Sequence, residues 1–165
     1  MKIRFLCMVA AVGLLAACAE EPKKAAETGG VATPPVAAPQ KAVESIVPGS
    51  QADFVKNVGD RVFFDFDKSI IKPEGKEQLT KWVAFLNKYP NDQLLIEGHC
   101  DERGTREYNL ALGERRANAV KEFLVANGIQ ASRLKTVSYG KERPAVLGSN
   151  EAAWAQNRRG VGVIQ

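Results

Sequence analysis

Residues 97–120, EGHCDERGTREYNLALGERRANAV, constrain the fold of this chain more than any other stretch. An apolar strand pattern ends here, a polar loop follows, and Thr105 is placed to cap an amphipathic helix, because its hydroxyl can accept from N–H groups of the first turn. The polar side chains of the loop and of the helix face behind it are Asp101, Arg103, Asn109 and Arg116. The stretch therefore predicts a strand–loop–helix corner that carries a ligand site.

The remaining pattern alternates strands and helices between residues 61 and 164. Strands are predicted at 61–66, 93–98, 134–139 and 160–164, and helices at 73–89, 105–127 and 151–157. Trp82 and Phe85 lie on the apolar period of the first helix, so we expect them in the core. This order predicts an α/β (α+β) sandwich with helices packed on a sheet. Periodicity alone does not predict which strands pair.

The helix at 105–127 has a predicted sheet-facing stripe and an adjoining strip. The stripe comprises Leu110, Gly113, Ala117, Val120 and Leu124, and the strip comprises Asn109, Leu112 and Arg116. Glycine inside a helix costs about 1 kcal/mol relative to alanine. Gly113 in the stripe therefore predicts a close approach of helix and sheet.

Several motifs, in order, resemble the signature of OmpA-like peptidoglycan-binding domains in the variant of the peptidoglycan-associated lipoproteins. They are EGHCDERGT at 97–105, EYN at 107–109, LGERRANAV at 112–120, FDFDK at 64–68, VSYGK at 137–141 and NRR at 157–159. The resemblance covers about residues 60–165. It implies a four-stranded mixed parallel and antiparallel sheet in a β-α-β-α-β-(α)-β order, within a domain that we place at 51–165.

The resemblance also implies a peptidoglycan-binding set. The guanidinium of Arg116 can hold a carboxylate with paired donors, and Asp101 can hold an ammonium. Together they would bind a group with both charges, which OmpA-like domains find in the diaminopimelate of the stem peptide. Motif position adds Arg103, Asn109, Leu112, Phe66 and Asp67. Asn109 has an equal alternative as a structural amide that orders the Asp101 loop.

His99, Cys100 and Asp101 suggest a metal or catalytic cluster, but consecutive residues at a strand end alternate sides and cannot converge. His99 is the only histidine of the chain. We therefore expect no metal, no cofactor and no catalytic residue. Cys100 is expected to be a small buried residue; an intermolecular disulfide stays open as an alternative.

Residues 1–17 have the pattern of a secretory signal, with Lys2 and Arg4 before an apolar run too short to span a bilayer. Leu15-Ala16-Ala17-Cys18 resembles the lipobox of bacterial lipoproteins, which predicts acylation of Cys18. The alternative is an ordinary secreted protein cut after a small residue. Ala19 and Glu20 follow Cys18 directly, in place of the aspartate that commonly retains lipoproteins at the inner membrane. By resemblance this points to the outer membrane, with the domain facing the periplasm.

Residues 18–50 are predicted to be a flexible tether, because a segment rich in Ala, Pro, Lys and Glu cannot bury enough apolar surface to offset its chain entropy. The chain has 165 residues, 45% of them hydrophobic, which suits one modest domain with an extension. Without Lys2 and Arg4, 21 basic residues against 19 acidic ones leave a net charge of +2. This balance argues against nucleic acid as a partner.

Three functions fit these patterns. The first is a non-enzymatic lipoprotein that ties the outer membrane to peptidoglycan; the resemblance adds the Tol–Pal system, with its periplasmic β-propeller protein as a partner. The second is an enzyme that modifies peptidoglycan, for which no second catalytic cluster is visible in the sequence. The third is an OmpA-like lipoprotein of a different envelope assembly.

Overall fold

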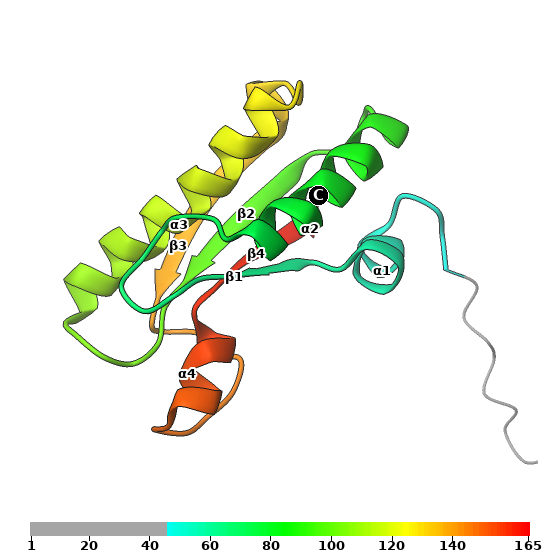
Figure 1. Cartoon of the computed structure of the whole chain (residues 1–165). Helices are drawn as coiled ribbons and strands as arrows, with labels where there is room; N and C mark the ends of the chain where they lie inside the picture. Colours follow the sequence, from blue (N-terminus) through cyan, green and yellow to red (C-terminus); the bar gives the residue numbers. More distant parts are fainter. Residues whose placement is uncertain (1–45) are drawn as a thin grey trace, which may run out of the picture. The chain divides into compact units, whose positions relative to one another are not determined.

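The computed structural model describes residues 46–165 (Figure 1). The predicted signal segment, the lipidation site at Cys18 and most of the predicted tether lie outside these residues. The described elements are α1 (Gln51–Asp53), η1 (Phe54–Val58, a π-helix), β1 (Arg61–Phe63), α2 (Pro73–Lys88), β2 (Leu94–His99), α3 (Arg106–Ala126), η2 (Ala131–Arg133), β3 (Leu134–Gly140), α4 (Glu151–Asn157) and β4 (Arg159–Ile164). Within residues 46–165, no helix is both long enough and apolar enough to cross a bilayer.

The four strands form one mixed sheet in the order β1-β4-β2-β3. β2 pairs with β3 in parallel, and β4 pairs antiparallel with both β1 and β2. This arrangement confirms the predicted mixed sheet. The parallel pair is joined by α3, the usual solution because parallel strands need a long crossover connection.

Helices α2 and α3 cover the same face of the sheet (Figure 1). A Cβ atom added to Gly162 would meet the ring of Trp82 from α2, and one added to Gly160 would meet Val120 from α3. Because Gly160 and Gly162 are two residues apart on β4, they point to the same face of the sheet, so both helices pack on that face. The core lies between this face and the helices.

The predicted core positions in α2 are confirmed. Trp82 is fully buried and Phe85 nearly so, and the indole N–H of Trp82 donates to the carbonyl of Gly59 at 2.7 Å. Phe54, from the short N-terminal helical segment that sequence patterns did not predict, packs edge-on against Trp82 with ring centroids 5.3 Å apart. Burying one such side chain contributes about 1.5–3 kcal/mol.

The close approach of α3 to the sheet is also confirmed. A Cβ on Gly98 would lie 1.8 Å from the carbonyl oxygen of Gly113, and a Cβ on Gly113 would lie 2.3 Å from the hydroxyl of Ser138. No side chain fits between the two backbones. This contact holds the N-terminal half of α3 directly against the end of β2.

Two predictions about elements are wrong. Leu110, assigned to the sheet-facing stripe, is 50% exposed, because the buried arc of α3 is centred near Val120 and extends toward Arg116 instead. The first strand ends at Phe63 instead of residue 66. Phe64 still donates its N–H to Arg158, but the chain then turns, and Asp67 adopts a left-handed φ of 56°.

Candidate ligand-binding pocket

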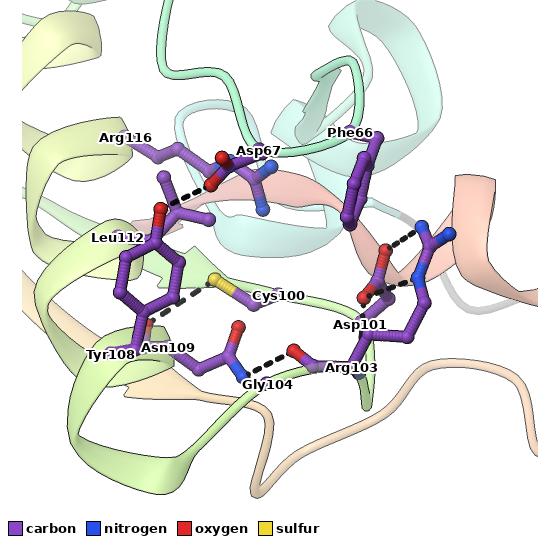
Figure 2. Close-up of a pocket in the computed structure, with 10 residues that line it drawn as sticks. All are labelled: Phe66, Asp67, Cys100, Asp101, Arg103, Gly104, Tyr108, Asn109, Leu112 and Arg116. Carbon is purple, nitrogen blue, oxygen red and sulfur yellow. Dashed lines mark hydrogen bonds and ion pairs between the residues drawn. The ribbon is translucent and has the colours of Figure 1, made fainter.

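A pocket of about 140 Å³ lies where the loop after β1, the loop after β2 and the first half of α3 meet (Figure 2). Its lining residues are Phe66, Asp67, Cys100, Asp101, Arg103, Gly104, Tyr108, Asn109, Leu112 and Arg116. A cavity of about this size accommodates a group of several non-hydrogen atoms. All seven residues predicted as a binding set line it, and the sequence prediction missed Cys100, Gly104 and Tyr108.

Arg116 is fully buried, and its guanidinium holds the pocket walls together. Nε donates to the carbonyl of Lys68 at 2.9 Å, Nη1 to that of His99 at 2.7 Å, and Nη2 to that of Asp65 at 3.0 Å. Burial lowers the pKa of this guanidinium, which still remains charged at neutral pH. Each terminal nitrogen has one further N–H beyond these three bonds, and Arg116 lines the pocket.

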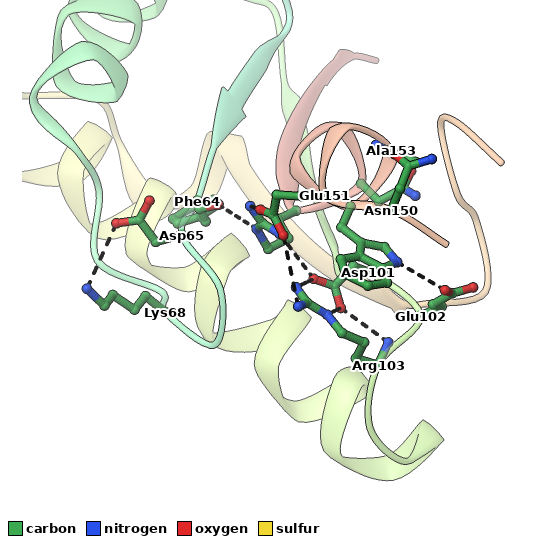
Figure 3. A network of polar contacts seen from close by, with 12 residues as sticks. Phe64, Asp65, Lys68, Asp101, Glu102, Arg103, Asn150, Glu151 and Ala153 are labelled. Atoms are coloured by element: carbon green, nitrogen blue, oxygen red, sulfur yellow. Dashed lines mark hydrogen bonds and ion pairs between the residues drawn. The ribbon is translucent and has the colours of Figure 1, made fainter. Parts of the chain in front are cut away.

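Asp101 is 4% exposed and is held by two arginines, Arg103, which is labelled in Figure 3, and Arg158. One carboxylate oxygen accepts from the backbone N–H and from Nε of Arg103, both at 3.2 Å. The other accepts from Nη2 of Arg103 at 2.5 Å and from Nη1 of Arg158 at 3.3 Å. Burial opposes ionisation, but these charged donors outweigh it and lower the pKa of Asp101. The carboxylate is therefore ionised at neutral pH.

The guanidinium of Arg103 is sandwiched between two aromatic rings. Its central carbon lies 3.9 Å from the ring centroid of Phe66 and 4.1 Å from that of Trp154. Trp154 also donates its indole N–H to Glu102 at 3.0 Å, which connects α4 to the loop after β2. Arg103 thus closes one side of the pocket while its side chain remains 30% exposed.

Asn109 orders the Asp101 loop, which is the structural one of the two roles predicted for it. Its Nδ2 donates to the carbonyl of Arg103 at 2.7 Å and to that of Thr105 at 3.0 Å. Both amide hydrogens are thereby used, which places Oδ1 toward the pocket (Figure 2). Asn109 therefore supports the Asp101 loop, and its remaining acceptor faces the pocket.

The loop after β1 is fastened to α3 by Asp67, whose carboxylate accepts from the hydroxyl of Tyr108. This bond raises the pKa of Tyr108. Leu112 supplies an apolar wall nearby. The left-handed backbone at Asp67 turns its side chain toward the helix, a conformation that Asp and Asn tolerate better than most residues.

Arg158 is the main contributor that the predicted set omits. Its side chain, 8% exposed, donates to the carbonyl of Phe64 at 3.1 Å, to Asp101, and to Glu151 at 2.7 Å. It joins the end of β1, the loop after β2 and α4. The NRR motif at 157–159 was the available signal, but sequence spacing does not indicate that Arg158 reaches Asp101, 57 residues away.

His99 and Cys100 diverge, as strand alternation predicted. His99 stacks on Tyr139 with ring centroids 5.5 Å apart, on the sheet face away from α3. Burial and the nearby Arg159 and Arg143 lower the pKa of His99 to about 3. Cys100 is buried on the other side, where its thiol donates to the carbonyl of Asn109 at 3.3 Å, and burial raises its pKa. A neutral imidazole and a protonated thiol on opposite faces do not form a nucleophilic pair.

The fold is an α/β domain with its pocket at a strand–helix corner, and known proteins share this fold. The OmpA family matches residues 63–158. A peptidoglycan-associated lipoprotein of Agrobacterium fabrum is 52% identical over 120 residues, which cover 73% of this chain and 68% of that protein. One of Mesorhizobium japonicum is 46% identical over 162 residues, covering 93% of this chain and 88% of that protein.

A solved structure agrees. The crystal structure of the peptidoglycan-associated lipoprotein from Burkholderia pseudomallei has a TM-score of 0.63 and 44% sequence identity, and the match covers 64% of this chain and 90% of that one. The chain belongs to the OmpA family and, within it, to the peptidoglycan-associated lipoproteins.

Proposed function

We propose that this protein is a non-enzymatic lipoprotein that binds peptidoglycan through the diaminopimelate of the stem peptide. One observation carries the proposal: a buried guanidinium and a buried carboxylate, from Arg116 and Asp101, line the same small pocket. Buried charges are expensive to maintain unless they are paired or used.

The pocket chemistry favours a ligand that carries both charges on one group. The end of a diaminopimelate side chain has a carboxylate and an ammonium on the same carbon, whereas lysine has the ammonium alone. The carboxylate would accept from the free N–H donors of Arg116, and the ammonium would lie near Asp101. Leu112 and Phe66 supply apolar walls for the methylene chain, and Oδ1 of Asn109 supplies an acceptor.

The test is a titration of the full chain, purified in detergent, with stem peptides that differ only at the third residue. We expect the diaminopimelate peptide to bind at least tenfold more tightly than the lysine peptide, which corresponds to about 1.4 kcal/mol. Equal binding of the two peptides would remove the carboxylate role of Arg116. Isothermal titration calorimetry gives both affinities directly.

We further propose that the protein is anchored in the outer membrane by lipid on Cys18, faces the periplasm, and ties the membrane to the wall. The names of its relatives support the lipoprotein assignment.

A Tol-system role would add the periplasmic β-propeller protein as a partner that competes for the pocket surface. Adding saturating diaminopimelate peptide to a complex of the two proteins should then release the propeller; an unaffected complex would contradict a shared surface.

The proposal that it is not an enzyme has support from the pocket's own nucleophile. Cys100 lines the pocket, but burial keeps its thiol protonated, and its hydrogen points to the Asn109 carbonyl. Incubation of the purified protein with peptidoglycan should therefore release no muropeptides beyond those released by a heat-denatured sample.

A further inference from the structure

The carboxylate of Asp101 already accepts four hydrogen bonds from within the chain. Three come from Arg103, through its backbone N–H, Nε and Nη2, and one comes from Nη1 of Arg158. A carboxylate offers about four lone-pair positions. A ligand ammonium that binds Asp101 must therefore replace one of these donors.

Of the groups that donate to Asp101, only the side chain of Arg103, with its two donor nitrogens, is free to leave. Arg158 is buried and is also held by Phe64 and Glu151. The backbone N–H of Arg103 is fixed by the course of the loop, whose carbonyl at the same residue binds Asn109. The side chain of Arg103 is 30% exposed, and its remaining ion pair, with Glu151, is long at 4.0 Å.

Apart from its two bonds to Asp101, which a ligand ammonium would replace, the Arg103 side chain is held in place by contacts that are weak in water. Its guanidinium stacks between the rings of Phe66 and Trp154, 3.9 and 4.1 Å from their centroids, and Phe66 is itself 54% exposed. A cation over an aromatic ring at an exposed site gains about 0.5–1 kcal/mol. Rotation into solvent rehydrates the guanidinium and frees two positions on Asp101.

We propose that Arg103 is an internal competitor for the ammonium of the ligand, so that binding exchanges one cation for another at Asp101. The inference rests on the proposed function and assigns Arg103 its part in that site. When a binding-competent state is only partly populated, the apparent affinity falls by that fraction. The exchange also sharpens specificity: a ligand with an ammonium alone displaces Arg103 without gaining the second interaction, with Arg116.

The test compares two stem peptides that differ by one amino group. One contains meso-diaminopimelate, and the other contains 2-aminopimelate, which keeps the side-chain carboxylate but lacks the ammonium. We expect Arg103→Gln to tighten binding of the diaminopimelate peptide roughly three- to tenfold, because the competitor is removed. The 2-aminopimelate peptide should bind no more tightly, so the ratio of the two affinities should rise.

Arg106→Gln is the matched control. Arg106 lies three residues away, is 74% exposed, and pairs with Glu142 instead of Asp101. Arg106→Gln removes the same charge from the same region without touching Asp101. The ratio of the affinities for the diaminopimelate and 2-aminopimelate peptides should therefore stay within twofold of the parent's. Arg103→Lys keeps the charge but lacks the planar fork, and should give a ratio between those of the parent and Arg103→Gln.

The outcomes separate this inference from the proposed function. If the parent binds neither peptide, both fail. If the parent binds the diaminopimelate peptide in preference to a lysine peptide, but Arg103→Gln weakens both pimelate peptides equally or leaves their ratio unchanged, only the exchange is overturned. Should Arg103→Gln not fold, as judged by thermal unfolding, an Arg103→Lys ratio equal to the parent's would overturn it.

Discussion

Arg116 combines a structural and a binding task in one side chain. Its three carbonyl partners belong to the loop after β1 and to the end of β2, so it fixes both walls of the pocket. Removing it leaves buried carbonyls without a donor, at a cost of about 1–3 kcal/mol each. Its effects on stability and on binding therefore need separate measurements.

The first prediction concerns coupling between Arg116 and Asp101. If the two hold one ligand group, Arg116→Ala and Asp101→Ala should each cost about 2–4 kcal/mol of peptide binding. The double variant should cost less than the sum by roughly 0.5–3 kcal/mol. Arg116→Lys should restore only part, because a point charge lacks the planar fork. Calorimetric titration of the parent, the two alanine variants and the double variant gives the cycle, Arg116→Lys is titrated alongside, and circular dichroism checks folding.

Strict additivity in that cycle would show that the two side chains act on different parts of the ligand. Parent-like binding by both folded single variants would contradict the proposed site altogether.

The second prediction concerns the pH dependence of stability at His99. Its pKa is about 3 in the folded protein against 6.5 for an exposed histidine, so below pH 6.5 the unfolded chain binds more protons. The contribution of neutral His99 to the free energy of unfolding is therefore complete above pH 6.5. It is lost as pH falls toward 3, by at most about 1.4 kcal/mol per pH unit. His99→Gln should flatten this slope between pH 6 and 4, as measured by urea unfolding. Identical slopes for the two proteins would contradict a buried neutral imidazole.

At the scale of elements, the contact between β2 and α3 positions the site. The Asp101 loop leaves the end of β2, and the residues Asn109, Leu112 and Arg116 project from α3. Gly98 and Gly113 let these two backbones touch, which sets the distance between the loop and the helix.

The third prediction follows from this contact. A methyl group at Gly98 would overlap the backbone of Gly113, which cannot move as a side chain tip can. Gly98→Ala should therefore destabilise the fold by about 3 kcal/mol or more and weaken peptide binding in the fraction that folds. Gly128→Ala provides a contrast, because nothing lies within 4 Å of a Cβ there, and its cost arises only from a φ of 93°. Chemical denaturation measures both, and a Gly98→Ala variant no less stable than Gly128→Ala would argue against the backbone contact.

At the scale of the whole molecule, attachment to the membrane and binding to the wall are predicted to reside in different parts of the chain. The pocket lies entirely within residues 46–165, whereas the predicted lipidation site is Cys18. The two activities should therefore separate.

The fourth prediction tests this separation. Cys18→Ser should abolish incorporation of labelled palmitate and release the protein from the outer-membrane fraction, because several acyl chains at about 0.8 kcal/mol per buried methylene are lost. The purified variant should bind the diaminopimelate peptide within twofold of the parent's affinity. Continued palmitate labelling of the variant would place the anchor elsewhere.

Much of this molecule was determined by local sequence pattern. Helix α2 begins at Pro73 and ends before Tyr89-Pro90, and α3 is capped by Thr105. The apolar period of α2 places Trp82 and Phe85 in the core. These signals are readable because they act between residues a few positions apart. Resemblance to the motifs of the OmpA-like domains, at 64–68, 97–109 and 112–120, also identified seven residues that line one pocket.

Tertiary structure alone decided how those residues are used. Whether Leu110 or Arg116 is buried depends on where α3 lies over the sheet, which the helical period does not specify. The pairing of Arg158 with Asp101, and of Arg116 with the carbonyls of Asp65 and Lys68, joins segments about 50 residues apart. Hydrogen bonds of this kind depend on geometry that arises only after the sheet and helices pack, so residue types and spacing could not reveal them.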